Sequence, residues 1–374
     1  MRRREVIIVQ RRLTDYRVPL FKMMRKYLAD SDIDLRVLHG EGTLIERGKK
    51  DSGNLRWAEQ CSTHYLLGDR ICWQNYYKQT AHADLVIVTQ ENRLIYNLLA
   101  LTAARPRRIA FWGHGRNMQS QSPDGIKERF KRLTVDKVDW WFAYTDLTRR
   151  YLIERGFSED RISVLNNAID TTDLANLFGE ITDDDKARVR AKMRIGTEPV
   201  GVFVGSLYSE KRLSFLVAVA QTIREHIPDF VLLIIGDGPD RQLVELASKQ
   251  FPWIRALGRQ DGRAKLEFLA IADIMLNPGL VGLGILDAFV CGLPIVTTDC
   301  GLHSPEISYL SESGNGIMTE NTEEAYVKAV VSLLSDEALL THLQEGARDS
   351  AKYYSIEAMA DRFCGGIINC LSSS

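Results

Sequence analysis

The 374-residue sequence has no apolar run that approaches the roughly 20 residues a membrane-spanning helix needs. Its opening residues, 1–4, are a methionine and three arginines. They lead directly into a short apolar segment, 5–10, and not into the apolar core of a signal peptide. We therefore expect a cytoplasmic protein that is not exported.

The six cysteines include no C-x-x-C pair, and the seven histidines show no metal-ligand spacing. Scattered cysteines are typical of reduced cytosolic thiols, and the absent spacings argue against a zinc site. The sequence also has no Walker motif, no G-x-S-x-G elbow and no G-x-G-x-x-G loop after a strand. We expect neither a bound metal nor a cofactor.

The net charge is only −1, but it is unevenly distributed. Residues 1–170 carry 30 Lys and Arg against 21 Asp and Glu, whereas the remainder carries 18 against 28. A basic first half indicates an anionic partner: a membrane surface, a lipid phosphate or nucleic acid. A basic helix predicted at about 126–135 could rest on anionic lipid headgroups, although an ordinary solvated face explains it equally well.

Short apolar segments alternate with helical patterns along both halves of the chain. The predicted strands are 5–10, 33–38, 84–89, 108–112, 140–144 and 162–165, then 200–204, 230–235, 254–257, 274–277 and 294–298. Alternation at this spacing predicts βαβ units and parallel sheets. We expect an α/β protein with two Rossmann-like, doubly wound domains at 1–175 and 176–354, and a last helix at about 355–374. Residues 40–80 show no clear pattern.

Residues 272–301 hold the most informative segment, in which two apolar strands are joined by a helix that begins near 282. The link at 278–284 contains three glycines, which let the backbone approach a ligand. A phosphate there would gain the unpaired N–H groups and the positive end of the helix dipole. Asp287, one turn into the helix, would repel that phosphate and is better suited to a sugar hydroxyl. A plain strand-to-helix turn remains the alternative.

Ligands of open parallel sheets bind outside the carboxyl ends of the strands. The strand ending at residue 204 is followed by Gly205 and Ser206, and then by Lys211 and Arg212 at the next helix start. A positive charge is unfavourable at the N-terminal, positive end of the helix dipole. A bound phosphate therefore explains Lys211 and Arg212 at this position better than the alternative of a solvated basic pair.

The next two strand ends also carry glycine: Gly236 and Gly238 follow one, and Gly258 with Arg259 follows the other. Each glycine alone is weak evidence, because glycine is common at strand ends. Together with Lys211 they predict a nucleotide-diphosphate site in the second domain.

In the first half, His114 stands between two glycines directly after a predicted strand. A lone histidine is more often a satisfied structural residue than a functional one. The position at a strand end nevertheless favours a functional role for His114.

Several segments resemble, in order and spacing, the retaining glycosyltransferases of sequence family 4, which have the GT-B fold. The similarity covers nearly the whole chain and is strongest over 200–320. It is carried by VGSLYSEKRLSFLV, LLIIGDGPDR and LDAFVCGLPIVTTDCG in the second half, and by AFWGHG and SVLNNAID in the first. The resemblance implies two Rossmann-like domains that face a cleft, with the last helix crossing back to the first domain.

The resemblance also implies roles for single residues. It places Lys211 at the donor diphosphate above Gly205, Asp287 at the ribose of the nucleotide, and His114 at the transferred sugar. Gly236 and Gly238 would shape the donor pocket, and Gly258 and Arg259 would lie by the base of the nucleotide, mostly through their backbone.

Three departures from the family pattern stand out. The first acid of the usual paired-glutamate motif falls at Gly279, and the second is Asp287. Ser206 replaces a frequent arginine, for which Arg212 could compensate. Backbone N–H groups of Leu280, Val281, Gly282, Leu283 and Gly284 could take over donor contacts. The usual glycine-rich first loop is replaced by 10–17, where Arg11, Arg12 or Arg17 could bind an acceptor phosphate.

We therefore expect a retaining, metal-independent glycosyltransferase. It would transfer a sugar from a nucleotide-diphosphate sugar to a glycan or lipid-linked acceptor of cell-surface polysaccharide synthesis, at the inner face of the membrane and without nucleic acid as a partner. Two alternatives stay open: a GT-B sugar-nucleotide epimerase, and a non-catalytic scaffold subunit.

Overall fold

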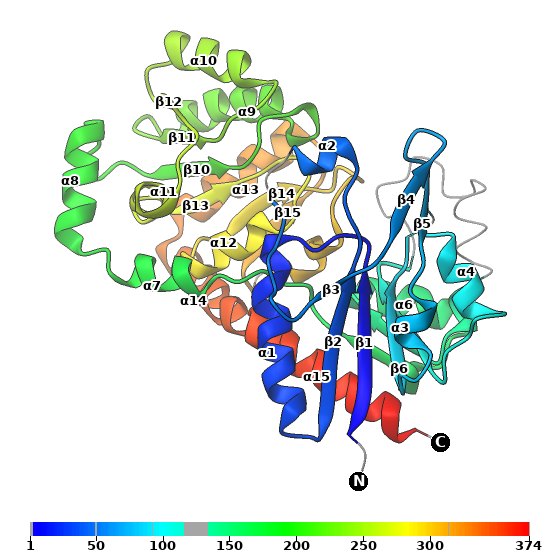
Figure 1. Cartoon of the computed structure of the whole chain (residues 1–374). Helices are drawn as coiled ribbons and strands as arrows, with labels where there is room; N and C mark the ends of the chain where they lie inside the picture. Colours follow the sequence, from blue (N-terminus) through cyan, green and yellow to red (C-terminus); the bar gives the residue numbers. More distant parts are fainter. Residues whose placement is uncertain (1–2, 49–50, 92, 116–133, 313, 374) are drawn as a thin grey trace. The chain divides into compact units, whose positions relative to one another are not determined.

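The computed structural model describes residues 3–48, 51–91, 93–115, 134–312 and 314–373. The chain forms two compact units: unit 1 comprises Met1–Asp170 and Ser355–Ser374, and unit 2 comprises Thr171–Tyr354 (Figure 1). Within the described residues, no helix combines the length and the apolar character needed to cross a membrane.

Unit 1 is built on a parallel sheet with the strand order β3-β2-β1-β6-β7-β8-β9. The order reverses beside β1, as in a doubly wound fold, because β1 pairs with β2 on one side and with β6 on the other. The strands are β1 (Arg4–Gln10), β2 (Ile33–His39), β3 (Glu59–Gln60), β6 (Leu85–Thr89), β7 (Ile109–Gly113), β8 (Trp140–Ala143) and β9 (Ile162–Val164). An antiparallel hairpin, β4 (Thr63–Leu66) and β5 (Ile71–Gln74), lies outside this sheet.

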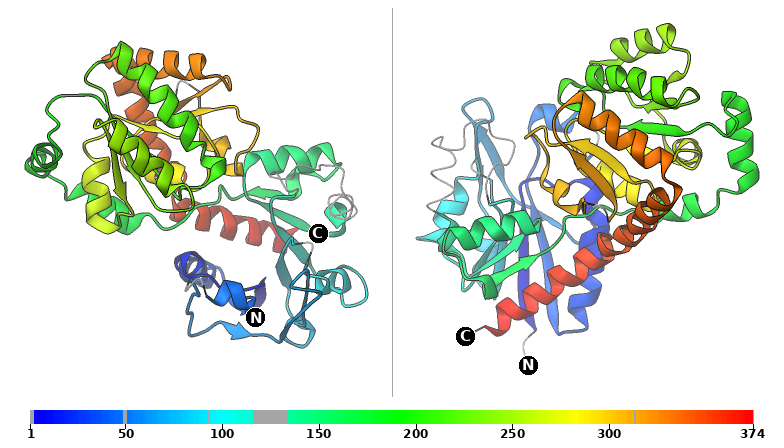
Figure 2. Two further views of the ribbon diagram at one scale, coloured as in Figure 1. Left: turned by 90° about the horizontal axis from the view of Figure 1, so that it is seen from above. Right: turned by 180° about the vertical axis from the view of Figure 1, so that it is seen from behind.

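Helices cover both faces of the unit 1 sheet. They are η1 (Asp15–Arg17), α1 (Val18–Ala29), α2 (Leu44–Arg47), α3 (Tyr77–Thr80), α4 (Tyr96–Leu101), η2 (Val135–Lys137), α6 (Asp146–Glu154), η3 (Glu159–Arg161) and α15 (Ile356–Ser372). The last helix, α15, packs beside α1 (Figures 1 and 2). Phe21 of α1 and Phe363 of α15 both contact Trp112 of β7. Gly366 lets α15 pack closely on β8 and β9, since a Cβ there would lie 2.3 Å from Ser163 Oγ and 2.7 Å from the Phe142 ring.

Unit 2 is built on a second parallel sheet with the strand order β12-β11-β10-β13-β14-β15. Its strands are β10 (Val200–Val204), β11 (Val231–Ile235), β12 (Ile254–Gly258), β13 (Ile274–Leu276), β14 (Ile295–Thr298) and β15 (Gly316–Thr319). Strands β11, β13 and β14 are buried along their whole length, which is why they read as continuous apolar runs and not as alternating ones.

The core of unit 2 lies against this sheet and includes Phe203, Leu232 and Val330. The helices of unit 2 are α7 (Thr172–Gly179), α8 (Asp183–Met193), η4 (Ser209–Lys211), α9 (Leu213–His226), α10 (Arg241–Gln250), α11 (Gly262–Leu269), α12 (Gly284–Val290), η5 (Pro305–Tyr309), α13 (Glu323–Ser335) and α14 (Glu337–Tyr353).

The α/β fold predicted from the sequence is confirmed, and two local expectations differ from the structure. The helix expected over 91–103 is only α4, because Arg93 and Ile95 hydrogen-bond through their backbone to Cys72. The segment expected as a linker after 171 contains the helix α7. The predicted basic helix at 126–135 lies almost wholly outside the described residues.

Candidate functional site

Lys211 lies at the carboxyl end of the unit 2 sheet, on the short turn η4 that follows β10. Its side chain is buried, with 8% of the residue exposed. The ammonium donates to the carbonyl of Leu280 and lies 5.7 Å from the centre of the Tyr208 ring. Within the part of the chain that the structure describes, no carboxylate forms an ion pair with it. With respect to the residues that the structure describes, Lys211 is therefore a buried cation without a counter-charge.

Burial lowers the pKa of Lys211 to about 8, because the charged form loses hydration that the protein does not replace. The ammonium thus remains mostly protonated at neutral pH, close to its titration point. A ligand phosphate would supply the missing negative charge and restore the ordinary preference for the charged form.

The loop after β13 packs directly against η4. A Cβ on Gly279 would lie 2.2 Å from the carbonyl oxygen of Glu210 and 2.8 Å from Lys211 Cα. Leu280 N–H also donates to the Glu210 carbonyl. Glycine at position 279 is therefore required by the close contact of two backbones, and a glutamate side chain does not fit there without moving the loop.

The glycines at the other strand ends serve a similar purpose. A Cβ on Gly236 would lie 1.8 Å from the Gly205 carbonyl oxygen, and one on Gly238 would lie 2.3 Å from that of Leu207. These two glycines hold the loop after β11 against the loop after β10. A Cβ on Gly205 would make only ordinary van der Waals contacts, among them one of 3.8 Å to Lys211 Cε. Gly205, Gly236, Gly238 and Lys211 are therefore brought together at the carboxyl end of this sheet, where Gly236 and Gly238 permit the close packing of its loops.

Arg212 is held by its own unit. It has a left-handed backbone, with φ of 56°, and its guanidinium donates to the Pro278 carbonyl, Thr298 Oγ1 and Asn321 Oδ1. It therefore connects the start of α9 to the loop after β13, to the last residue of β14 and to the loop after β15. Ser206 is exposed, and so is Arg259, which pairs with Asp261.

Asp287 lies on α12 and forms an ion pair of 2.9 Å with Lys265 of α11, a residue that the sequence reading missed. Val281 N–H donates to His303 Nδ1 at 3.1 Å, so that His303 orients the loop before α12. His303 lies five residues beyond the end of β14, a position that could have drawn attention to it. Gly282 and Leu283 are half-buried in this loop. A Cβ on Gly284, the first residue of α12, would have no other atom within 4 Å.

In unit 1, His114 follows β7 and packs against Tyr144, which follows β8, with ring centres 4.1 Å apart and ring planes inclined by 36°. Tyr144 also accepts a hydrogen bond of 3.2 Å from Arg17. The Arg17 guanidinium lies 4.6 Å from the centre of the Trp112 ring. The carboxyl end of the unit 1 sheet therefore carries a connected cluster of a histidine, an arginine and aromatic rings.

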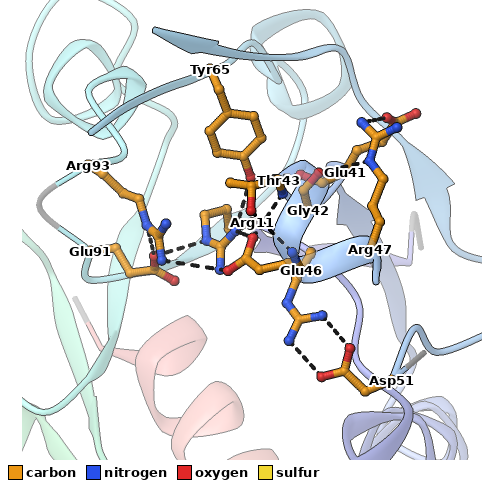
Figure 3. A network of polar contacts seen from close by, with 11 residues as sticks. Arg11, Glu41, Gly42, Thr43, Glu46, Arg47, Asp51, Tyr65, Glu91 and Arg93 are labelled. Carbon is orange, nitrogen blue, oxygen red and sulfur yellow. Dashed lines mark hydrogen bonds and ion pairs between the residues drawn. The ribbon is translucent and has the colours of Figure 1, made fainter. Parts of the chain in front are cut away.

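Arg11 and Arg12 are held differently from Arg17. Arg11 is bound by both oxygens of Glu46 at 2.7 Å, by Glu91 at 3.1 Å and by Tyr65 (Figure 3). Arg12 makes a bidentate pair with Asp51 at 2.7 and 2.8 Å. A cavity of about 300 Å³ lies next to these pairs, and its lining includes Arg12, His39, Gly40, Glu41, Glu46 and Gln60.

Comparison with known proteins adds to this geometry. Residues 198–336 match the family model described as Glycosyl transferases group 1. A relative, the alpha-monoglucosyldiacylglycerol synthase of Acholeplasma laidlawii, is 27% identical over 44% of this chain and 42% of its own length. The phosphatidyl-myo-inositol mannosyltransferase of Mycobacterium leprae is 24% identical over 61% of this chain and 58% of its own. The chain thus spans about half the length of the curated relatives it matches.

A solved structure with a similar fold is that of HepE from Anabaena in complex with UDP. The TM-score is 0.69 at 13% identity, covering 97% of this chain and 99% of the other. The GT-B fold that the resemblance implied is confirmed. The segment that matches the glycosyl transferases group 1 model, residues 198–336, includes Lys211, the loop before α12 and Asp287.

Proposed function

We propose that this protein is a retaining glycosyltransferase of sequence family 4, which transfers a sugar from a nucleotide-diphosphate sugar to a glycan or lipid-linked acceptor of the cell surface. The observation that carries the proposal is the buried, uncompensated ammonium of Lys211 at a strand end. The matched family and the two relatives, both named for transfer onto lipids, favour this reading over the epimerase and scaffold alternatives.

In this proposal unit 2 binds the donor. Lys211 binds the diphosphate, the backbone of 280–284 lines the pocket, and Asp287 binds the ribose in exchange with Lys265. Charge grows on the diphosphate as the bond to the sugar breaks, and a fixed ammonium stabilises it without reorganisation. That role removes the need for a divalent cation.

Unit 1 binds the acceptor, and His114 contacts the transferred sugar. We propose a front-face reaction, in which the leaving diphosphate takes the proton of the acceptor hydroxyl as the new glycosidic bond forms. The polar cavity beside Arg12 is a candidate for acceptor recognition. We further propose that the reaction occurs at the cytoplasmic face of a membrane, with the protein as a peripheral component; the lipid names of the two relatives support this.

The test is Lys211→Ala. We expect nucleotide-sugar turnover, assayed in EDTA, to fall by at least a hundredfold, because the variant loses the charge that stabilises the leaving group. Lys249→Ala, at an exposed position on α10, is the matched control and should behave as wild type. A thermal-shift screen of UDP-, GDP-, ADP- and dTDP-sugars would identify the donor beforehand.

Wild-type turnover in Lys211→Ala would overturn the assignment of the diphosphate site. The anomeric configuration of the product, read by NMR, tests retention separately, and an inverted product would contradict it. Loss of activity in EDTA that Mg²⁺ restores would contradict the metal-independent mechanism.

A further inference from the structure

Two arginines of the described residues are less than a tenth exposed: Arg11 at 8% and Arg17 at 5%. Arg11 pairs with the carboxylates of Glu46 and Glu91. Arg17 forms no ion pair among the residues that the structure describes, although it is the more buried of the two. A buried charge that lacks a counter-ion is unfavourable unless something else compensates it.

Aromatic side chains surround the Arg17 guanidinium. Its central carbon lies 4.6 Å from the centre of the Trp112 ring, 4.9 Å from Tyr16 and 5.6 Å from Tyr144. Nη2 donates to the Tyr144 hydroxyl, while Nη1 is buried and has no hydrogen-bond partner among the described residues. The aromatic faces attract the cation and hold it in place, but they carry no net charge and accept no hydrogen bond from Nη1.

The position of this arginine follows from the fold. The turn η1, which ends at Arg17, connects β1 to α1 and places the side chain over Trp112 at the carboxyl end of β7. Tyr16 is 43% exposed, so it is the part of the aromatic cage that faces solvent. Because Nη1 is buried, a ligand would reach it only after this cage opens.

We propose that Arg17 binds an anionic group of the acceptor, a phosphate ester or a carboxylate, through the fork of Nη1 and its neighbouring nitrogens. The inference rests on the proposed function. It narrows the three arginines of the first loop to one, because Arg11 and Arg12 are already occupied by Glu46, Glu91 and Asp51. A planar guanidinium suits both anions, since it donates two parallel hydrogen bonds.

The bound anion would lie close to the reaction. Tyr144 connects the guanidinium to His114, because its hydroxyl accepts from Arg17 and its ring centre lies 4.1 Å from that of His114. An acceptor held by its anionic group at Arg17 would present a nearby hydroxyl toward His114. The inference therefore specifies a substrate class: acceptors that carry a negative charge next to the sugar-accepting hydroxyl.

The first experiment measures anion binding without turnover. It uses the Lys211→Ala background, because Lys211 would bind phosphate as well. We expect inorganic phosphate to raise the melting temperature of Lys211→Ala at constant ionic strength, and the shift to disappear in Lys211→Ala/Arg17→Met. Acetate distinguishes the two candidate ligand groups. An equal rise in melting temperature with acetate indicates a carboxylate, and a rise with phosphate alone indicates a phosphate ester.

The second experiment measures turnover in the Lys211 wild-type protein. Arg17→Met should raise KM for the acceptor ten- to a hundredfold and leave KM for the donor unchanged. Arg56→Met, at an exposed arginine of unit 1, is the control and should change neither. If Arg17→Met does not fold, Arg17→Lys keeps the charge but loses the fork, and should raise acceptor KM by a smaller factor.

Stability separates a ligand site from a structural role. Methionine has a similar volume without the charge, so Arg17→Met should melt at the same or a higher temperature than wild type if the guanidinium awaits a ligand. A lower melting temperature together with unchanged phosphate binding would overturn the inference. Failure of Lys211→Ala to affect nucleotide binding would overturn the proposed function instead, so the two failures are distinguishable.

Discussion

Charged residues at the carboxyl ends of the two sheets differ in whether an ion pair compensates their charge. Arg11, Arg12 and Asp287 are all held in ion pairs, whereas Lys211 and Arg17 have no such partner among the described residues. Burial alone is costly for either cation, so each is better explained by a ligand than by the fold. Compensation depends on neighbours that are distant in sequence, such as Glu46 and Glu91 for Arg11, and for this reason the sequence could not separate Arg17 from Arg11 and Arg12.

The pKa of Lys211 leads to a prediction about pH. Burial lowers this pKa to about 8, so the ammonium deprotonates at a pH where phosphates, with a second pKa of about 6, are fully charged. The affinity for nucleoside diphosphate should therefore hold between pH 7 and 8 and then fall by up to tenfold per pH unit. Calorimetric titration of the donor nucleotide from pH 7 to 9 measures this effect.

Lys211→Ala is the control for that titration, and its weak binding should not change over the same range. A constant wild-type affinity up to pH 9 would contradict the prediction. Stability should move the opposite way: without ligand, the free energy of unfolding should rise between pH 8 and 10.5, since the unfolded chain then binds more protons.

At the scale of elements, regular strands were predictable and short irregular segments were not. The strands of unit 2 have continuous apolar runs because both of their faces are covered. Residues 40–80 instead form elements of two to four residues, α2, β3, β4, β5 and α3. Such elements are too short for a hydrophobic periodicity to appear in the sequence. They are held by contacts between residues distant in sequence, such as the hydrogen bond from Arg11 to Tyr65. The contact of Gly279 with Glu210 could not be predicted either, since it joins two loops.

The element α2 supplies a prediction about stability. Glu46 forms a capping box with Thr43, the N-cap of α2, and accepts hydrogen bonds from Arg11. The hydrogen bonds from Arg11 lower the pKa of Glu46 to about 2 (Figure 3). Glu46→Gln should destabilise unit 1 by about 3 kcal/mol at pH 7, because one pKa unit corresponds to about 1.4 kcal/mol. The contribution of Glu46 is lost as the pH falls from about 4.5 to 2, so the variant should be less sensitive to acid over that range.

Denaturant unfolding followed by circular dichroism measures the effect of Glu46→Gln. The matched control is Glu41→Gln, on the same segment, because the Glu41–Arg47 pair is about half exposed on both sides and should contribute less than about 1 kcal/mol. Equal losses in the two variants would show that burial does not govern these ion pairs.

At the scale of the whole molecule, the chain leaves unit 1 at residue 170 and returns to it at residue 355, so both ends of the sequence build one unit. Phe363 of α15 is fully buried against Trp112 and Phe142, with ring centres 5.0 and 4.5 Å apart. Phe363→Ala should therefore destabilise unit 1 by about 3–5 kcal/mol, the usual cost of removing a buried aromatic ring. Leu333→Ala, in the core of unit 2, is the matched control.

Calorimetry with and without donor nucleotide distinguishes the units, because a ligand raises the melting temperature of the unit that binds it. The transition that nucleotide raises should be lowered by Leu333→Ala, while Phe363→Ala should lower the other. A nucleotide-dependent transition that responds only to Phe363→Ala would place the donor in unit 1 and would contradict the assignment to the sheet edge around Lys211.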